Sequence, residues 1–407
     1  MLKPSLDDLI KSSFRSILKN KGRTALTSLG IIIGVTSVIL LTSIGNGLQI
    51  YINKQFESLG ANTVFVTPGK IFNDQGRFSN SPSSRLVTTS FTKKDLNDLR
   101  RNLKNSTVSP NSQTIVDVST SFANKKSVTT LGSNYLYGSS NNLIPIANSG
   151  RWFTKKEDDK NSNVVVLGYN LAIDLFPKTS ALGKKIIAKG KTLKVIGVLD
   201  KKGGSLGGPA LDDYLFVPIG LVFEFTGTEN INAFNIKADK QQNIEAIKSE
   251  IKKILLKKYD SDAFSVFDSS QLLSSINSII GTLTIALTGI AAISLVVGGI
   301  GIMNIMLVTI TERTREIGLR KAIGAYPRAI LIQFLIEAII LSSIGGAVGI
   351  ILGSLGTWGI AQFFPAQITI GSISIAFGVS FAVGVIFGVA PAKKASMLSP
   401  IEALRYE

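Results

Sequence analysis

A dense group of charged side chains directly follows an apolar stretch in the segment Met303–Ala325, MNIMLVTITERTREIGLRKAIGA. Glu316 and Arg320 are four residues apart in the order that stabilises a helix, and Glu312 and Arg315 are three apart. This spacing predicts a short charged helix, which could receive a push from a soluble partner through ion pairs. A solvated basic loop with no further role is the alternative.

The residues after this segment predict where one helix ends and the next begins. Gly324 can end the charged helix, and Pro327 can begin the next one because its fixed φ suits the first helical turn.

Glu337, nine residues beyond Arg328, is the one ionisable residue well inside an apolar stretch. Because buried charge is costly in a membrane, such a residue is a functional candidate. We expect a structural anchor that pairs with a basic neighbour near the inner membrane surface; a proton relay is the alternative.

The composition excludes several other kinds of reactive centre. The 407 residues contain no histidine and no cysteine, so disulfides, thiolate nucleophiles, the usual zinc sites and Ser-His-Asp catalysis are excluded. Gly190–Thr192 reads GKT, but Lys185 stands where a P-loop requires its first glycine, so we expect a turn between strands there. The pairs Asp158–Asp159 and Asp212–Asp213 are expected to be exposed turn residues. We therefore expect no catalytic residue, no metal site and no cofactor in this chain.

Long apolar stretches must position these residues. Hydrophobic residues make up 45% of the chain. Charged residues make up 17%, against about 25% in an average soluble domain. A membrane-spanning helix needs about 20 apolar residues. We predict four such helices, at residues 25–47, 276–310, 329–355 and 369–391.

The second apolar stretch is longer than a bilayer requires. A continuous helix over Ser269–Thr311 would be about 64 Å long, against a hydrocarbon core of about 30 Å. Its first part also carries several polar residues. We expect a helix that continues outward as a stalk from residue 276; a polar linker before an ordinary span is the alternative.

Glycines recur at four-residue intervals in the last two predicted spans. They are Gly345, Gly349 and Gly353 in the third span, and Gly384 and Gly388 in the fourth. Small residues at this spacing allow helices to pack closely. Packing within one chain and packing between two chains explain the pattern equally well.

The distribution of basic residues predicts the membrane topology. Of 44 Lys and Arg residues, 14 lie in residues 1–24, 311–328 and 392–407, whereas the loop between the third and fourth spans has none. The other 30 lie in residues 48–275, but long domains are translocated regardless of their charge. The positive-inside rule then places both termini and residues 311–328 in the cytoplasm, and residues 48–275 outside. We therefore expect a multi-pass protein of the cell (inner or plasma) membrane.

Residues 5–20 predict an amphipathic helix on the inner leaflet, or one that docks on a partner. The net charge of +17 fits this topology, and without a DNA-reading motif we expect no nucleic-acid partner.

Residues 48–275 predict a water-soluble α/β domain between the first and second spans. Thr92–Leu103 is a predicted helix, with Thr92 and Asp95 at the spacing of a capping box. Strands and helices at both ends of the segment predict one α/β subdomain, and a β-rich subdomain is inserted at about 135–225. We assign a predicted hairpin at Ser112–Gly132 to the α/β subdomain.

Four segments resemble the MacB/FtsX-type ABC permeases, the mechanotransmission class. Met303–Ala325 resembles their cytoplasmic coupling loop and Asn20–Gly47, NKGRTALTSLGIIIGVTSVILLTSIGNG, their first span. Leu59–Gly69, LGANTVFVTPG, resembles the start of their external domain, and Pro391–Glu407, PAKKASMLSPIEALRYE, their C-terminus. The resemblance covers the whole membrane part and implies four spans. It also implies a MacB-like core domain between spans one and two, in which a β-rich subdomain is inserted into a porter-like α/β subdomain.

The resemblance also implies partners and site residues. Such permeases form homodimers served by two copies of an ABC ATP-binding subunit, which holds the ATP and Mg; a membrane-fusion-type adaptor is a further partner that the resemblance allows. Because no P-loop is present, we expect ATP hydrolysis on a separate chain. Gly318 and Gly324 would allow close packing against the ATPase. The charged residues that would face it are Glu312, Arg313, Arg315, Glu316, Arg320 and Lys321.

On this basis we expect the permease subunit of an ABC efflux or export system. It would transmit ATP-driven motion to an external domain that handles peptide, antibiotic or lipid-linked cargo. A lipoprotein-releasing permease and an FtsX-like regulator of cell-wall hydrolases are the alternatives within the family. A membrane-anchored sensor or adhesin is an alternative from another class, although a simple anchor has no need for four spans and a charged loop.

Overall fold

The computed structural model describes residues 21–59, 62–72, 78, 90–203 and 210–404, so the predicted amphipathic helix at residues 5–20 lies outside it. The chain divides into two compact units. The helical unit contains the residues up to Tyr51 and those from Asn277 onward, and the α/β unit contains Ile52–Ile276. This division agrees with the prediction of a soluble domain between the first and second spans.

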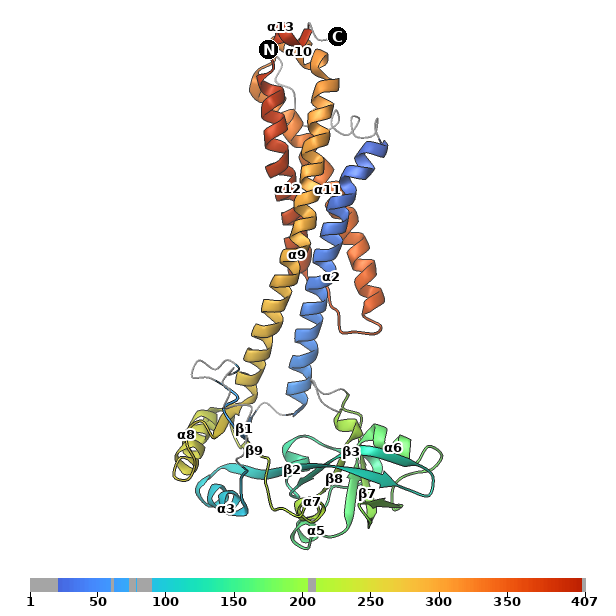
Figure 1. Ribbon diagram of the computed structural model, residues 1–407, viewed down its shortest axis with the longest axis vertical. Coiled ribbons are helices and arrows are strands. Elements are labelled where there is room, and N and C mark those ends of the chain that lie inside the picture. Colours follow the sequence, from blue (N-terminus) through green and yellow to red (C-terminus); the bar gives the residue numbers. More distant parts are fainter. Residues whose placement is uncertain (1–20, 60–61, 73–77, 79–89, 204–209, 405–407) are drawn as a thin grey trace. The chain divides into compact units, whose positions relative to one another are not determined.

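Four long apolar helices form most of the helical unit (Figure 1). They are α2 (Lys21–Leu59), α9 (Ser269–Glu312), α11 (Pro327–Ile360) and α12 (Ile370–Met397). The short helix α10 (Thr314–Ala322) connects α9 to α11, and the short helix α13 (Pro400–Leu404) follows α12. Within the described residues, these four are the helices long and apolar enough to cross a membrane, which confirms the predicted four-span fold. α9 is continuous over 44 residues and includes the polar start of the stretch, as the stalk interpretation requires. The bilayer boundaries stay predictions.

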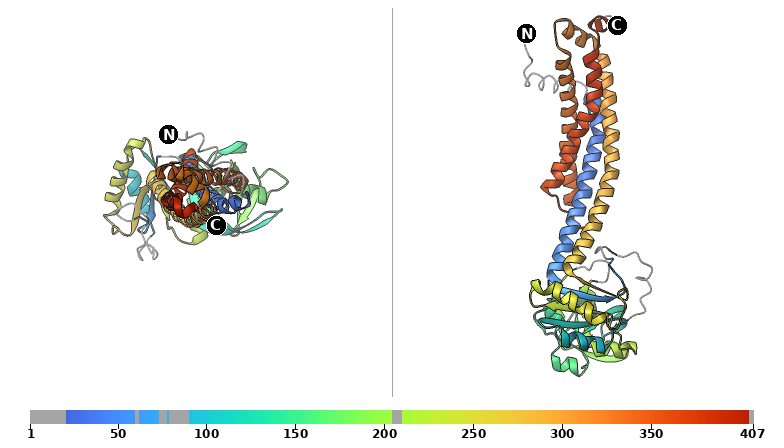
Figure 2. Two further views of the ribbon diagram at one scale, coloured as in Figure 1. Left: turned by 90° about the horizontal axis from the view of Figure 1, so that it is seen from above. Right: turned by 90° about the vertical axis from the view of Figure 1, so that its left-hand side faces the viewer.

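Glycines bring the long helices into close contact within this unit. A Cβ atom at Gly349 of α11 would lie 2.8 Å from the Cβ of Val35 on α2. A Cβ atom at Gly384 of α12 would lie 2.1 Å from the Oγ of Ser342 on α11. Both distances are shorter than van der Waals contact, so any side chain would push the helices apart. The predicted glycine spacing therefore serves packing within the chain, and the helices lie alongside one another in both figures (Figures 1 and 2).

A ten-stranded mixed sheet forms the centre of the α/β unit. Its strand order is β10-β1-β9-β2-β3-β8-β5-β7-β4, and β6 pairs with β2 and β7. The strands are β1 (Thr63–Pro68), β2 (Ser106–Ser119), β3 (Asn124–Ser133), β4 (Pro145–Gly150), β5 (Val164–Leu167), β6 (Lys185–Ala188), β7 (Lys191–Leu199), β8 (Leu215–Pro218), β9 (Ala233–Ala238) and β10 (Phe264–Asp268). The helices are α3 (Lys93–Asn102), α4 (Tyr137–Ser140), α5 (Lys155–Asp159), α6 (Tyr169–Leu175), α7 (Ile219–Thr226) and α8 (Ile244–Leu255).

The first and last parts of the α/β unit together build one half of its sheet, as predicted. β10, β1, β9 and the first part of β2 pair with one another, and α3 and α8 pack on them through a core that includes Leu99, Phe234 and Ile251. The predicted capping box begins α3. The Thr92 hydroxyl accepts a hydrogen bond from the Asp95 backbone N–H, and the Asp95 carboxylate accepts one from the Thr92 N–H.

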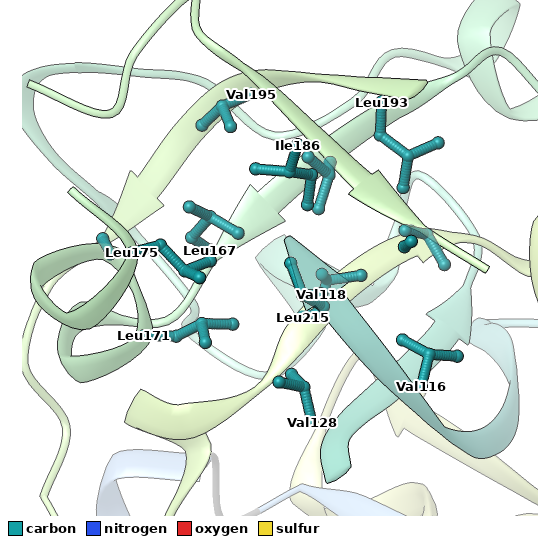
Figure 3. Packing of buried hydrophobic residues seen from close by; sticks show 14 of the residues in the cluster. Val116, Val118, Val128, Leu167, Leu171, Leu175, Ile186, Leu193, Val195 and Leu215 are labelled. Atoms are coloured by element: carbon teal, nitrogen blue, oxygen red, sulfur yellow. The ribbon is translucent and has the colours of Figure 1, made fainter. Parts of the chain in front are cut away.

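The β-rich half begins earlier than the predicted residue 135, so that boundary is wrong. Ser106–Asn111 of β2 pair with β9, whereas Ser112–Ser119 of the same strand pair with β3 or β6. The predicted hairpin belongs to the β-rich half, because Val116 and Val128 share a core with Leu171 and Leu215 (Figure 3). A single long strand thus contributes to both halves. As predicted, Lys189 and Gly190, both with positive φ, form the turn between β6 and β7.

Two predicted surface acids are partly or fully buried, so the expectation of exposed turns is wrong for them. Asp212 is 2% exposed, and its carboxylate accepts hydrogen bonds from the N–H groups of Lys202 and Gly203 at 2.8 and 2.9 Å. Asp158 lies in α5 and accepts one from the Tyr135 N–H at 3.1 Å. Burial raises the pKa of Asp158 to about 6, although the Tyr135 hydrogen bond opposes the shift.

Replacing Asp158 by asparagine should stabilise the α/β unit above pH 6. The folded pKa of about 6 exceeds the ordinary 3.8, so the stabilising contribution of Asp158 is complete below pH 3.8 and is lost as the pH rises through 6. The amide is neutral throughout and still accepts the Tyr135 hydrogen bond. We expect the thermal midpoint, followed by tryptophan fluorescence, to rise by about 2–4 °C at pH 7.5 and little at pH 4.5. The same change at exposed Asp239 is the control; equal effects of both variants at pH 7.5 would contradict the assignment.

Candidate coupling site

The predicted charged segment lies where α9 ends and α10 begins. Glu312 is the last residue of α9, and α10 starts at Thr314. Arg313, between the two helices, has φ −104° and ψ 12°, which is not a helical conformation. Thr314 is buried, and its hydroxyl donates a hydrogen bond to the carbonyl oxygen of Ile310 at 2.9 Å. That bond satisfies a carbonyl group at the end of α9, where a helix normally leaves such groups without an intrahelical donor.

The carboxylate of Glu316 lies between two arginine side chains. Arg320 donates a hydrogen bond to Glu316 Oε1 at 2.5 Å, which is the pair expected from the four-residue spacing. The Nε atom of Arg313 lies 3.4 Å from Glu316 Oε2. Each such half-exposed ion pair contributes little stability, about 0–1 kcal/mol. Its effect here is to hold the two guanidinium groups in fixed positions on one side of α10.

Two basic side chains of α10 attach it to the neighbouring long helices. Arg320 also donates to the side-chain oxygen of Gln333 on α11 at 2.7 Å. Lys321 donates to the carbonyl oxygens of Ser396 and Leu398, at 2.6 and 2.7 Å. Those carbonyls stand at the C-terminal end of α12, where the helix dipole favours a cation. Arg320 and Lys321 therefore make bonds within the chain, and the implication of the family resemblance that they face a partner stays a prediction.

The two predicted glycines have different roles. A Cβ atom at Gly318 would lie 2.7 Å from the Cβ of Ala403, so the absence of a side chain lets α13 pack on α10. Gly324 has open space around it within the chain, and its close packing against the ATPase stays a prediction. Its φ of +101° is one that glycine adopts easily, and its N–H donates to the Lys321 carbonyl oxygen at 3.0 Å. Gly324 therefore ends the helix, as the sequence predicts.

Glu337 is buried on α11, with 6% of its side chain exposed. Its Oε2 atom lies 3.6 Å from the NH1 atom of Arg313, whose side chain is 29% exposed. Glu337 and Gln333 are one turn apart on α11. Glu337 contacts Arg313, and Gln333 accepts a hydrogen bond from Arg320. The carboxylate therefore belongs to a polar network that joins α11 to the start and the end of α10.

One side of α10 remains exposed. Arg315, Leu319 and Ile323 follow one another at four-residue intervals, so they share a face, and Leu319 and Ile323 are 53% and 79% exposed. On α13, Ile401 is also 79% exposed. These apolar residues were not among the predicted site residues, although their four-residue spacing from Arg315 is visible in the sequence.

This mixture of charge and apolar surface suits non-covalent docking of another protein. Of the predicted charged residues, Glu312, Arg315, Glu316 and Arg320 are exposed, whereas Arg313 and Lys321 are partly buried. Among the residues that the structure describes, no group of three or more acidic side chains is placed to hold a metal ion.

Two family descriptions match the sequence over most of its length. Residues 24–254 match the MacB-like periplasmic core domain, and residues 288–400 match the FtsX-like permease C-terminal region. The first match alone covers more than half of the chain. The chain belongs to the MacB-like permease family.

Several proteins of the MacB-like family are similar over nearly the full chain. The Macrolide export ATP-binding/permease protein MacB of Bdellovibrio bacteriovorus is 36% identical over 98% of this chain and 61% of its own length. The protein of the same name from Azoarcus sp. is 35% identical over 99% of this chain and 60% of its own length. The chain thus spans about 60% of the length of these relatives. The solved periplasmic region of MacB from Actinobacillus actinomycetemcomitans is 21% identical, with a TM-score of 0.46 over 56% of this chain and 97% of that one.

Proposed function

We propose that this chain is the permease subunit of an ABC-type export system. In this proposal, motion of an ATP-binding subunit is received by α10 and passed to the long helices and the α/β unit. The similar MacB proteins are named for macrolide export and for a combined ATP-binding and permease role. By this similarity we propose a cargo of the peptide, antibiotic or lipid-linked class.

The attachment of α10 to its neighbours carries the proposal. Gln333, the end of α12 and Ala403 hold α10 from three sides. The face that bears Arg315, Leu319 and Ile323 stays exposed. A partner that presses on this face would therefore move α10 together with α11, α12 and α13, because hydrogen bonds and close packing join them. A merely solvated loop would need no such attachment.

The remaining parts of the proposal follow from the sequence pattern. We propose that residues 311–328 and both termini face the cytoplasm, that the α/β unit is outside, and that the chain lies in the cell membrane. We also propose that it acts as a homodimer with two ATP-binding subunits, which hold the ATP and Mg, and that it can engage a membrane-fusion-type adaptor. Since the 407 residues contain no P-loop pattern, the proposal places ATP hydrolysis on a separate subunit.

Replacing Arg315 by glutamate tests this function. The reversed charge should repel the acidic surface that we expect on the ATP-binding subunit, and Arg315 is exposed, so the fold should be unaffected. We expect the affinity for the co-purified ATP-binding subunit, and its ATPase activity in nanodiscs, to fall by about tenfold. The measurements are a pull-down titration and an ATPase assay at fixed protein ratio.

The matched control is Arg328→Glu. Arg328 is also exposed and lies in the first turn of α11. Because both substitutions replace arginine by glutamate, the charge change is the same. We expect near-normal affinity and activity for this variant. If Arg315→Glu matched the unmodified chain in both assays, or if Arg328→Glu were equally impaired, docking on the exposed face of α10 would be disproved.

A further inference from the structure

A cavity of about 580 Å³ lies at one edge of the sheet in the α/β unit, between β10 and α8. β10 is the last strand in the sheet order and pairs with β1. Among the described residues, no strand pairs with its other edge. An edge strand presents backbone N–H and C=O groups that another extended chain can bind. Phe264, Ser265 and Val266 of β10 line the cavity, so this edge forms its base.

One wall of the cavity is a stripe along α8. Glu245, Lys248, Ser249, Lys252 and Leu256 line the cavity and recur at three- or four-residue intervals. From Glu245 to Leu256, at about 1.5 Å per residue, the stripe is about 16 Å long. The five residues of β10, at about 3.4 Å each, span about 17 Å. The cavity can therefore hold an extended segment of about five residues along its length.

The opposite wall comes from the residues that follow β1. The Ser265 hydroxyl donates to the Gly69 carbonyl oxygen and accepts from the Ile71 N–H, both at 2.7 Å, which holds this segment against β10. Phe72 lines the cavity, and its ring centroid lies 4.9 Å from that of Phe267. This wall is therefore apolar at Phe72, whereas the α8 wall is charged.

The α8 wall carries two lysines: Lys248 is paired with carboxylates of the protein itself, so Lys252 supplies the positive charge of this wall. Lys248 is 13% exposed and lies 2.9 Å from Asp268 and 2.8 Å from Glu245. Burial tends to lower the pKa of Lys248, but hydrogen bonds to Glu245 and Asp268 outweigh it, and the pKa is raised. Lys252, one turn further along α8, is exposed. Acidic side chains lie toward the two ends, at Glu245 and at Asp262, which pairs with Lys70 at 3.0 Å.

We propose that this cavity binds an extended peptide segment with acidic side chains, which adds as a strand to the open edge of β10. Main-chain hydrogen bonds to β10 supply affinity. Since successive side chains of a strand point to opposite faces, an acidic side chain of the segment faces Lys252, and the apolar residues next to it face Phe72. This peptide site is distinct from the coupling site and does not depend on the proposed export function.

Peptide binding to the full chain in nanodiscs tests the site. The probe is an acetylated, dye-labelled pentapeptide of alternating valine and glutamate, followed by fluorescence anisotropy. We expect the same peptide with lysine for glutamate to bind at least about tenfold more weakly, because the wall is positive. A third peptide has proline at its central position, which removes a backbone donor, and should also bind about tenfold more weakly. Equal binding of all three peptides, or no binding of the first, would overturn the proposal.

Two neighbouring lysines provide a matched pair of variants. Lys252 lines the cavity, whereas Lys253 is exposed on α8 but does not line it. We expect Lys252→Glu to weaken the acidic probe by about tenfold and Lys253→Glu to change it less than about twofold. Because both substitutions lie on the helix surface, the fold should survive. Equal weakening by the two variants would show attraction by the overall positive charge only, and would overturn the assignment to this cavity.

Discussion

Replacing Gly318 by alanine is expected to weaken the contact between α10 and α13 and to reduce coupling to the ATP-binding subunit by about tenfold. The new methyl group would lie 2.7 Å from the Ala403 Cβ, far inside van der Waals contact. Such overpacking costs about 1–3 kcal/mol, and each 1.4 kcal/mol is about a tenfold change in an equilibrium. The thermal midpoint in detergent and the ATPase activity of the reconstituted complex measure the two effects.

A second substitution in α13 makes this test specific. Ala403→Gly removes the methyl group that causes the clash, at a cost of about 1 kcal/mol in helix propensity. We expect the double variant Gly318→Ala/Ala403→Gly to regain most of the midpoint and of the ATPase activity that Gly318→Ala loses. A double variant no better than Gly318→Ala alone would mean that contact with Ala403 is not the reason for glycine at this position.

Replacing Glu337 by alanine is expected to have the other large effect, on stability. It would remove the buried one of the two carboxylates that pair with the Arg313 guanidinium and leave only the half-exposed Glu316. Removing one member of a partly buried ion pair costs about 2–4 kcal/mol, since the remaining charge is poorly solvated. The free energy of unfolding in mild detergent should fall by that amount. Glu337→Gln should lose less than half as much, because the amide oxygen still presents a partial negative charge to Arg313.

These variants separate an anchor from a proton relay. If Glu337 is a structural anchor, Glu337→Gln keeps most of the transport activity over the whole pH range. If it transfers protons, the glutamine variant loses transport although it stays folded, because an amide does not titrate. Replacing both Glu337 and Arg313 by leucine provides a further check. We expect the double variant to recover stability, since neither charge is left alone, and full loss of stability in it would count against the ion pair.

Local patterns in the sequence predict the elements on which both tests depend. The apolar stretches that become α2, α9, α11 and α12 are visible because a membrane-spanning helix needs only length and an absence of charge. The end of α10 at Gly324 follows from the conformation that glycine allows. The pairing of Glu316 with Arg320 follows from the pitch of one helix. Each of these features involves residues within one or two helical turns.

The partners of α10 depend instead on how distant helices pack. Lys321 donates to a carbonyl 75 residues away in sequence, and Gly318 faces Ala403 of a different helix. The expectation that Lys321 and Arg320 face a soluble partner came from the family resemblance, and neither the resemblance nor their charge reveals an acceptor elsewhere in the chain. In the α/β unit, the division of β2 between two halves of the sheet and the burial of Asp212 were missed for the same reason.

Periodicity and composition thus establish which segments are helical or extended and which of them are apolar enough to enter a membrane, because those properties come from neighbouring residues. Folding decides which charged side chains are used inside the protein and which remain at its surface. Arg315 and Arg320 look alike in the sequence, yet Arg320 is hydrogen-bonded to Glu316 and Gln333, whereas Arg315 lies on the exposed face of α10. The difference arises because Gln333 of α11 lies beside Arg320, and a linear pattern does not specify which residue of α10 that glutamine reaches.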